Sequence, residues 1–211
     1  MKAIVCVTKN WGIGKDNKLI CTFKEDMNHF KQLTAGKAIV AGRKTFETFC
    51  NGKKPLIGRK NIVITSDRFF SKIYKEFCKY NGVFQIFGNT NDTTLAAIKS
   101  RRDYQPSRIN TGKGLKYTSV YIVNNISVVE DIANIVWDSD DTFVCGGGSI
   151  YKQLLPLCDT VYVTMCDCGE VEADTYFPNL DQDSNWKITD RSGDLVSESG
   201  IKYEFVTYSR S

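Results

Sequence analysis

Short apolar runs that alternate with helical stretches are the feature that most restricts the fold of this chain. Six runs read as buried strands because nearly every residue in them is apolar: residues 3–8, 38–41, 62–65, 119–123, 142–145 and 160–164. A seventh run, residues 202–208, alternates apolar and polar positions, as an antiparallel edge strand does. We therefore predict an α/β fold with a central, mostly parallel twisted sheet, an antiparallel C-terminal edge strand and helices on both faces.

Residues 69–118 depart from this alternation. We expect a helix at 70–80, a strand at 83–87 and a helix at 95–99, followed by a loop over residues 99–116 that contains Pro, Asn and Gly. The 211 residues of the chain correspond to about one domain. We therefore predict a single domain over residues 1–211 that carries 69–118 as an insertion.

The positive charge of the chain is concentrated in one segment. The formal net charge is +4, and residues 99–116 contribute six basic side chains against a single acid, Asp103. A solvated insertion and a contact with a polyanion both fit this charge. Because only Tyr104 and Tyr117 offer rings for base stacking, we favour the solvated insertion and expect no nucleic-acid partner.

The eight cysteines do not have the pattern of a disulfide framework. Cys6 and Cys145 lie in apolar, strand-like runs, Cys78 lies in a helical stretch, and no C-x-x-C motif occurs. We expect reduced cysteines, and hence a cytosol-like compartment. The longest apolar run, residues 3–7, is too short for a transmembrane helix, so we expect no membrane partner.

The sequence offers little to a metal ion. His29 is the only histidine, which excludes a multi-histidine site, and we expect it at the surface. Cys166-x-Cys168 together with Cys158 lacks the spacing of a zinc site. We therefore expect no metal.

Two strand-to-helix corners have the composition of anion-binding sites. The first reads Gly42-Arg43-Lys44-Thr45 and the second Gly146-Gly147-Gly148-Ser149. Glycine lets a phosphate approach the backbone, and the N–H groups at a helix N-terminus favour negative charge. Two such corners fit a phosphorylated dinucleotide, but a triple glycine is as often a tight turn, and both readings stay open.

Asp26 is the acid that most indicates a site. The helix that contains it has an apolar stripe of Phe23, Met27, Phe30 and Leu33, and Asp26 shares that face. One interpretation is a first-turn aspartate that the helix dipole stabilises. The other is a carboxylate held in a cleft for the cationic or amidine-like edge of a ligand.

Seven segments, in order, resemble the dihydrofolate reductase family, and the match leaves out only the insertion. They are Ile4-Val-Cys-Val, Gly12-Ile-Gly with Asn17, Glu25-Asp-Met-Asn-His-Phe-Lys31, Ala41-Gly-Arg-Lys-Thr-Phe-Glu47, Pro55-Leu-Ile-Gly-Arg-Lys-Asn61, Cys145-Gly-Gly-Gly-Ser-Ile-Tyr151 and Asp174-Thr-Tyr-Phe-Pro178. Residues 200–208 look like the closing strand of the family.

The resemblance implies NADPH-dependent reduction of 7,8-dihydrofolate to 5,6,7,8-tetrahydrofolate by hydride transfer, which supports one-carbon metabolism and thymidylate synthesis. It also implies a cytoplasmic enzyme that binds antifolate-type small molecules and is a monomer unless it is fused to thymidylate synthase. Two alternatives remain. One is a reductase of the same fold that acts on another pterin or a riboflavin precursor, and the other is a ligand-binding protein that has lost turnover.

The resemblance also assigns site residues. Asp26 would pair with N3 and the 2-amino group of the pterin, Thr164 would hydrogen-bond Asp26, and Tyr151 would lie near the reacting rings. The residues implied for the rest of the substrate are Ile4, Val5, Met27, Phe30, Phe49, Leu56 and Cys145, with Arg59 on the carboxylate of the glutamate tail. The residues implied for the cofactor are Cys6, Ile13, Gly14, Asn17, Gly42, Arg43, Lys44, Thr45, Thr65, Ser66, Gly146, Gly147, Gly148, Ser149 and Ile150.

Two further expectations come with the resemblance. Gly146 and Gly147 would be joined by a cis peptide, and residues 12–19 would form a mobile loop that closes over the nicotinamide. The chain also departs from the family, which usually has Leu or Met followed by Pro-Trp before the first helix. Here Leu19-Ile20-Cys21 stands in that place, so affinity, rate or antifolate response is expected to differ.

Overall fold

The computed structural model describes residues 1–49, 55–67, 70, 84–88, 108–110, 115–117, 119–136, 141–169 and 171–211, with the backbone alone at 84–88, 108–110, 115–117, 119 and 133–136. Contacts divide the chain into two compact units. Unit 1 comprises Met1–Leu33 and Val144–Ser211, and unit 2 comprises Thr34–Phe143.

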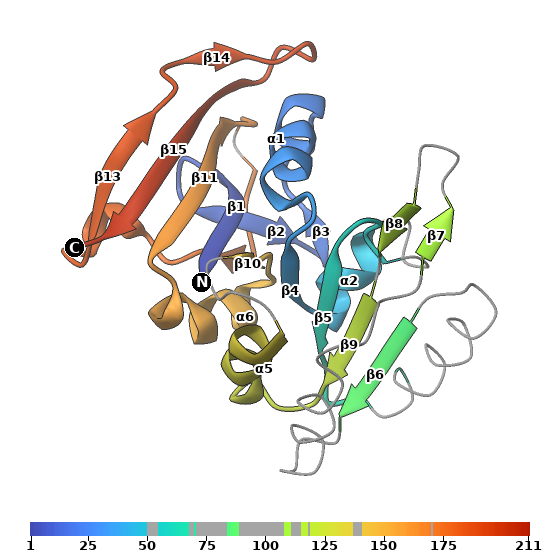
Figure 1. Cartoon of the computed structure of the whole chain (residues 1–211). Helices are drawn as coiled ribbons and strands as arrows, with labels where there is room; N and C mark the ends of the chain where they lie inside the picture. Colours follow the sequence, from blue (N-terminus) through green and yellow to red (C-terminus); the bar gives the residue numbers. More distant parts are fainter. Residues whose placement is uncertain are drawn as a thin grey trace. The chain divides into compact units, whose positions relative to one another are not determined.

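In the main sheet of unit 1, four strands lie side by side in Figure 1, and a short fifth strand pairs with one of them. Their order is β13 (Trp186–Arg191), β15 (Lys202–Arg210), β11 (Thr160–Asp167) and β1 (Lys2–Thr8). β1 and β11 are parallel, whereas β15 is antiparallel to β11. The predicted strands at 3–8, 160–164 and 202–208 are therefore confirmed. β13 and the short β14 (Leu195–Val196) pair with the other side of β15, and no strand was predicted for either.

A second, small sheet of unit 1 contains β12 (Thr175–Tyr176), β2 (Gly12–Lys15) and β3 (Lys18–Leu19). β2 and β3 form a hairpin whose two turn residues, Asp16 and Asn17, have φ values of 51° and 60°. Asp and Asn tolerate this left-handed conformation better than most residues do, and it matches the twist of a two-residue hairpin. The hairpin covers the whole of residues 12–19, the segment for which the family resemblance implies a mobile loop.

Trp11 anchors the base of this hairpin. Its side chain is buried, its ring stacks on Phe177 with centroids 6.2 Å apart, and its edge meets Tyr208. Trp11 itself has a φ of 64°. A left-handed backbone is costly for a large side chain, so the packing of the indole must offset that cost.

Unit 1 contains the helix predicted around Asp26 and the helix predicted to follow the triple-glycine corner. α1 (Lys24–Thr34) extends by one residue into unit 2, and α6 (Gly148–Leu154) continues into the 3-10 turn η3 (Leu155–Leu157). A further 3-10 turn, η4, covers Leu180–Gln182. The buried face of α6 consists of Ile150, Tyr151 and Leu154.

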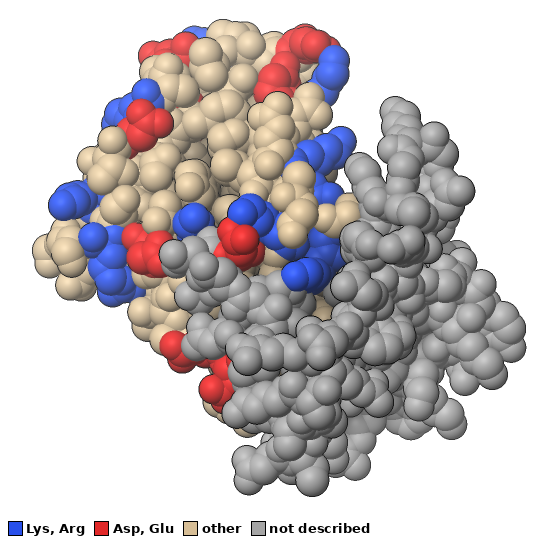
Figure 2. All heavy atoms as spheres, viewed as in Figure 1, with Lys and Arg blue, Asp and Glu red and all other residues tan. Residues whose placement is uncertain are grey.

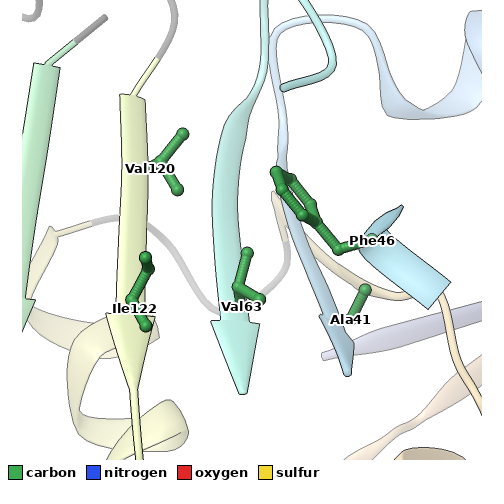
Figure 3. Packing of buried hydrophobic residues seen from close by; sticks show 5 residues of the cluster. All are labelled: Ala41, Phe46, Val63, Val120 and Ile122. Carbon is green, nitrogen blue, oxygen red and sulfur yellow. The ribbon is translucent and has the colours of Figure 1, made fainter. Parts of the chain in front are cut away.

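The sheet of unit 2 is entirely parallel among its described strands. Its order is β4 (Ala38–Gly42), β5 (Lys60–Ile64), β9 (Ser119–Val123) and β6 (Phe84–Gly88). The helices α2 (Arg43–Thr48) and α5 (Val128–Val136) follow β4 and β9, and β10 (Thr142–Val144) spans the boundary between the units. Figure 3 shows the core cluster of this unit, in which Phe46 of α2 packs with Ala41, Val63, Val120 and Ile122 of the strands.

The mostly parallel sheet with its antiparallel C-terminal strand is thus confirmed. The prediction of a loop over residues 99–116 is wrong in part, because β7 (Arg108–Asn110) and β8 (Leu115–Tyr117) form an antiparallel pair. The β-formers Ile109 and Tyr117 favour this pairing, and the surrounding charges concealed it. The helix expected at 95–99 lies outside the described residues, as does the one at 70–80 apart from Phe70.

The expectation that all cysteines are reduced is wrong for two of them. Cys21 and Cys168 form a disulfide with Cα atoms 6.3 Å apart, although 147 positions separate them in the sequence. Among the described cysteines, Cys6, Cys145, Cys158 and Cys166 form no disulfide. The pairing depends on the packing of two distant segments, which the spacing of cysteines along a chain does not reveal.

None of the helices in the described part of the chain is long and apolar enough to cross a membrane. Figure 2 shows that basic and acidic side chains are interspersed over the described surface of the face it presents.

Candidate active site

Asp26 lies in the first turn of α1, next to the central strands of unit 1. Its side chain is partly buried and hydrogen-bonds Thr164 of β11, which is 1% exposed. Burial raises the pKa of the Asp26 carboxyl, and the hydrogen bond with Thr164 opposes that rise. The predicted pair of Asp26 and Thr164 is therefore brought together, and the carboxylate has lost much of its water.

Apolar side chains accompany Asp26 without being fully covered. Met27 and Phe30 on α1 are only half-buried, although Phe23 at the start of the stripe is 5% exposed. Ile4 and Val5 are buried in β1, the strand parallel to β11. A half-buried apolar stripe beside a partly desolvated carboxylate is a suitable surface for a flat heterocycle that donates hydrogen bonds along one edge.

Cys6 of β1 lies directly opposite Thr164 in the parallel pairing of β1 with β11. A hydrogen bond with Cys166, then burial, and then the nearby negative charge of Asp26 hold the pKa of the Cys6 thiol well above its usual range. Cys6 is therefore a neutral thiol, consistent with a contribution to the site through its backbone.

Tyr151 of α6 is 4% exposed, and its hydroxyl donates a 2.6 Å hydrogen bond to the carbonyl oxygen of Ile4. Its ring meets the edge of Phe177, with centroids 4.8 Å apart. Burial, followed by the charges of Cys145 and Asp26, raises the pKa of Tyr151 well above its usual range. Tyr151 therefore acts as a neutral hydrogen-bond donor that holds α6 against β1.

The triple-glycine corner leads from β10 into α6. Gly146 and Gly147 are joined by a cis peptide, as the resemblance implied, and a Cβ on Gly146 would lie 3.0 Å from the ring of Tyr151. A Cβ on Gly148 would lie 2.7 Å from Cγ2 of Thr175 in β12. Glycine is thus required at both positions by close packing.

The remaining residues of this corner differ in exposure. Cys145 and Ile150 are buried, whereas Ser149 is exposed. In the hairpin, Ile13 is buried and Gly14 is partly buried, while Asn17 lies in the exposed turn. Asp174 fixes this turn because its Oδ2 accepts a 2.8 Å hydrogen bond from the amide of Asp16.

The second predicted corner, Gly42 to Thr45, lies in unit 2, where it connects β4 to α2. The guanidinium of Arg43 lies 3.0 Å from Oε2 of Glu47 and 3.8 Å from Oδ2 of Asp67. Arg43 is therefore oriented by two carboxylates, whereas Lys44 is exposed. On the next strand-to-loop junction, Thr65 is buried and its hydroxyl accepts a hydrogen bond from the amide of Asp67, while Ser66 is exposed.

Unit 2 also carries Phe49, Leu56 and Arg59, which are all partly buried. Arg59 donates from Nε to Thr34 at 2.8 Å and from its terminal nitrogen to the carbonyl of Ile57 at 3.0 Å. The side chain is thus held by the end of α1 and by its own loop.

Asn61 is a positioning residue that the sequence argument missed. Its side chain is fully buried, accepts a hydrogen bond from the amide of Leu56 and donates to the carbonyls of Leu56 and Arg59. These bonds shape the loop that presents Leu56 and Arg59. A polar residue inside the apolar run of β5 was the available signal.

His29 is not the surface residue that was expected. It is half-buried, and its ring stacks on Phe205 of β15 with centroids 4.0 Å apart. Burial lowers the pKa of this imidazole, so it packs as a neutral ring. The helical position placed His29 off the stripe of Asp26, but a strand covers that side of α1 as well.

Comparison with known proteins agrees with this geometry. The family model described as dihydrofolate reductase matches residues 1–96 and 109–210, which include parts of both units. A dihydrofolate reductase of Bacillus subtilis is 28% identical over 208 residues, covering 98% of this chain and 92% of that protein. One of Schistosoma mansoni is 30% identical over 220 residues, covering 99% and 95%. A bifunctional dihydrofolate reductase-thymidylate synthase of Arabidopsis thaliana is 29% identical over 220 residues, covering 99% of this chain but 34% of the relative.

Proposed function

The chain belongs to the dihydrofolate reductase family, and we propose that it reduces 7,8-dihydrofolate to tetrahydrofolate with NADPH. In this reaction C6 of the pterin gains a hydride and N5 gains a proton, so the C6–N5 double bond becomes a single bond. The observation that carries the proposal is the partly buried Asp26. It is hydrogen-bonded to Thr164 and flanked by the half-buried Met27 and Phe30.

We assign Asp26 to the amino edge of the pterin. A desolvated carboxylate binds strongly to a group that donates two N–H bonds side by side, because both acceptor oxygens are then satisfied. The raised pKa of Asp26 supports this assignment, since the free carboxyl lacks much of the solvation that a ligand would replace. Thr164 keeps the carboxyl oriented toward the face of Met27 and Phe30.

The donor groups of the chain fit a phosphorylated dinucleotide. When bound, NADPH supplies the hydride. We assign the pyrophosphate to the corner from Gly146 to Ser149 and the 2′-phosphate to Arg43, Lys44, Thr45 and Ser66. Cationic and hydroxyl side chains at the second corner suit a phosphate dianion, and Arg43 is already oriented there by Glu47 and Asp67.

The remaining roles follow from charge and position. Arg59 is assigned to the carboxylate of the glutamate tail, because a planar guanidinium meets a carboxylate with two parallel bonds. Tyr151 and Cys6 are neutral at working pH and take no part in moving charge. Asp26 therefore acts on the N5 proton indirectly, by polarising the pterin, while the hairpin from β2 to β3 limits the access of bulk water.

The test follows the absorbance of NADPH in the presence of dihydrofolate. Wild type should consume the cofactor only when dihydrofolate is present, and Asp26→Asn should lower turnover by about 100-fold near neutral pH. The loss should shrink as the pH falls, because the substrate then arrives already protonated. Asp190→Asn, on the exposed strand β13, is the matched control and should behave as wild type. A wild-type protein that binds NADPH without oxidising it, or an Asp26→Asn variant that is fully active at neutral pH, would refute the proposal.

A further inference from the structure

Four cysteines that the proposed reaction does not use as thiols form a cluster in unit 1. The sulfur cluster consists of Cys6 in β1, Cys21 between β3 and α1, Cys166 in β11 and Cys168 just after β11. Sγ of Cys166 lies 3.2 Å from Sγ of Cys168, which is disulfide-bonded to Cys21. Sγ of Cys6 lies 3.6 Å from Sγ of Cys166. The Cys21–Cys168 disulfide therefore contacts the thiol of Cys166, which in turn contacts the thiol of Cys6.

The four sulfurs differ in access. Cys21 and Cys166 are 8% and 2% exposed, and apolar side chains such as Phe23 and Tyr203 pack around them. Cys168 is only half-buried. A thiol–disulfide exchange begins at a sulfur that the attacking thiolate reaches, so an external thiol would meet Cys168 first.

The disulfide joins two segments that carry the candidate site. Cys21 lies five positions before Asp26 and two positions after the end of β3, and Cys168 lies four positions after Thr164. The covalent bond therefore joins the segment that leads into Asp26 to the segment that follows Thr164. It also ties the C-terminal end of the hairpin from β2 to β3 to the end of β11.

We propose that Cys21–Cys168 is a reversible thiol–disulfide modification site, opened by dithiol reductants, whose covalent state sets how firmly the start of α1 is held to β11. A thiolate of the reductant attacks Sγ of Cys168, which breaks the bond to Cys21 and forms a mixed disulfide. Cys21 leaves as a thiolate and takes up a proton. The second thiol of the reductant then displaces Cys168 as a thiol and leaves the reductant as a disulfide, so that two electrons and two protons reach the protein.

Reduction of the Cys21–Cys168 disulfide has a local consequence. A disulfide between distant residues restricts the chain mainly in its open states, so its loss makes opening of the segments it joins more frequent. The first turn of α1, where the amide of Met27 bonds the carbonyl of Phe23 at 3.1 Å, is the nearest helical element to Cys21. This inference concerns the covalent state of the chain and stands apart from the proposed reaction.

The experiment uses the full chain, purified without reductant and alkylated before digestion. Mass spectrometry should find the Cys21 and Cys168 peptides linked. Dithiothreitol should remove the link from the native protein without denaturant, and oxidised glutathione should restore it. Hydrogen exchange of the first turn of α1 should be about tenfold faster in the reduced protein. Neither readout needs substrate or turnover.

Variants separate the sulfur cluster from the other cysteines. Cys21→Ser and Cys168→Ser should show the faster exchange under both conditions. Cys158→Ser changes a buried cysteine outside the cluster, whose thiol donates to the carbonyl of Leu154, and should keep the response to dithiothreitol. Comparing reduced with oxidised wild type keeps the test valid if a variant does not fold.

Three results would overturn the proposal. The first is a linked peptide that yields to dithiothreitol only after denaturation, which would make the bond a static cross-link. The second is equal hydrogen exchange in the two states. The third is stoichiometric zinc in the untreated protein with all four thiols free, because the sulfurs of Cys21, Cys166 and Cys168 lie within 4.8 Å of one another and also suit a soft metal ion.

Discussion

The hydroxyl of Tyr151 donates a hydrogen bond to the carbonyl oxygen of Ile4, with 2.6 Å between the two oxygens. The bond joins α6 to β1 inside unit 1, directly beside the triple-glycine corner. We expect Tyr151→Phe to lower the free energy of unfolding by about 1–2 kcal/mol, because the buried acceptor loses its partner. Urea denaturation measures the change. The hydroxyl of Tyr176 also donates to a carbonyl, that of Ala173 at 2.9 Å, but this tyrosine is 48% exposed. Because water can replace the lost donor there, Tyr176→Phe should cost less than about 0.5 kcal/mol.

Asp26 should make the free protein less stable at neutral pH than it would be with a neutral side chain. Its pKa is raised in the folded state, so the folded protein binds this proton more tightly than the unfolded chain does. The associated stability is present at acid pH and is lost as the pH rises through the pKa of the folded state. Asp26→Asn should therefore have a higher melting temperature than wild type at pH 7, with the difference vanishing at acid pH. Thermal melts across this range would contradict the assignment if wild type were the more stable protein at pH 7.

Asn61 should affect substrate binding more than the chemical step. Asn61→Ala leaves the amide and carbonyl of Leu56 and the carbonyl of Arg59 without their side-chain partner. We expect a loss of about 2 kcal/mol in unfolding free energy and a raised KM for dihydrofolate with a smaller change in kcat. Asn185→Ala, which removes an exposed amide bonded to Asp183, should change neither. Steady-state kinetics and urea denaturation of the two variants decide the point.

The contact between Gly148 and Thr175 allows a double-mutant test. Gly148→Ala places a Cβ 2.7 Å from Cγ2 of Thr175, and the overpacking should cost about 1–3 kcal/mol. Thr175→Ser removes that methyl group and keeps the hydroxyl. Gly148→Ala should therefore cost much less free energy of unfolding in the Thr175→Ser background than in the wild type. If the two substitutions have additive costs, the clash lies elsewhere.

Much of the fold follows from local pattern. The buried strands β1, β4, β5, β9 and β11 are predictable because continuous apolar runs of strand length leave few other solutions. The position of Asp26 beside Met27 and Phe30 follows from helical periodicity. The positions of α2 and α6 follow from the glycine-containing corners that end the preceding strands. The hairpin of β2 and β3 escaped prediction because both strands are short and without periodicity and because β2 contains two glycines.

What the sequence could not supply are contacts between distant side chains. Cys21 and Cys168 are 147 positions apart, and nothing in their spacing predicts that the segment before α1 meets the end of β11. The same holds for His29, whose ring is covered by Phe205 of β15. Periodicity shows which side chains share one face of a helix. Whether a given face is buried depends on which distant strand packs against it.

The burial of Trp11 at the base of the hairpin makes the packing of this segment accessible to fluorescence measurement. Its indole is buried between Phe177 and Tyr208, and the next residue begins β2. Indole fluorescence responds to polarity and to neighbouring rings, so emission from Trp11 reports on the packing at the root of this hairpin without an attached dye. The residue that holds an unfavourable backbone angle is thereby also a natural optical probe of the segment it anchors.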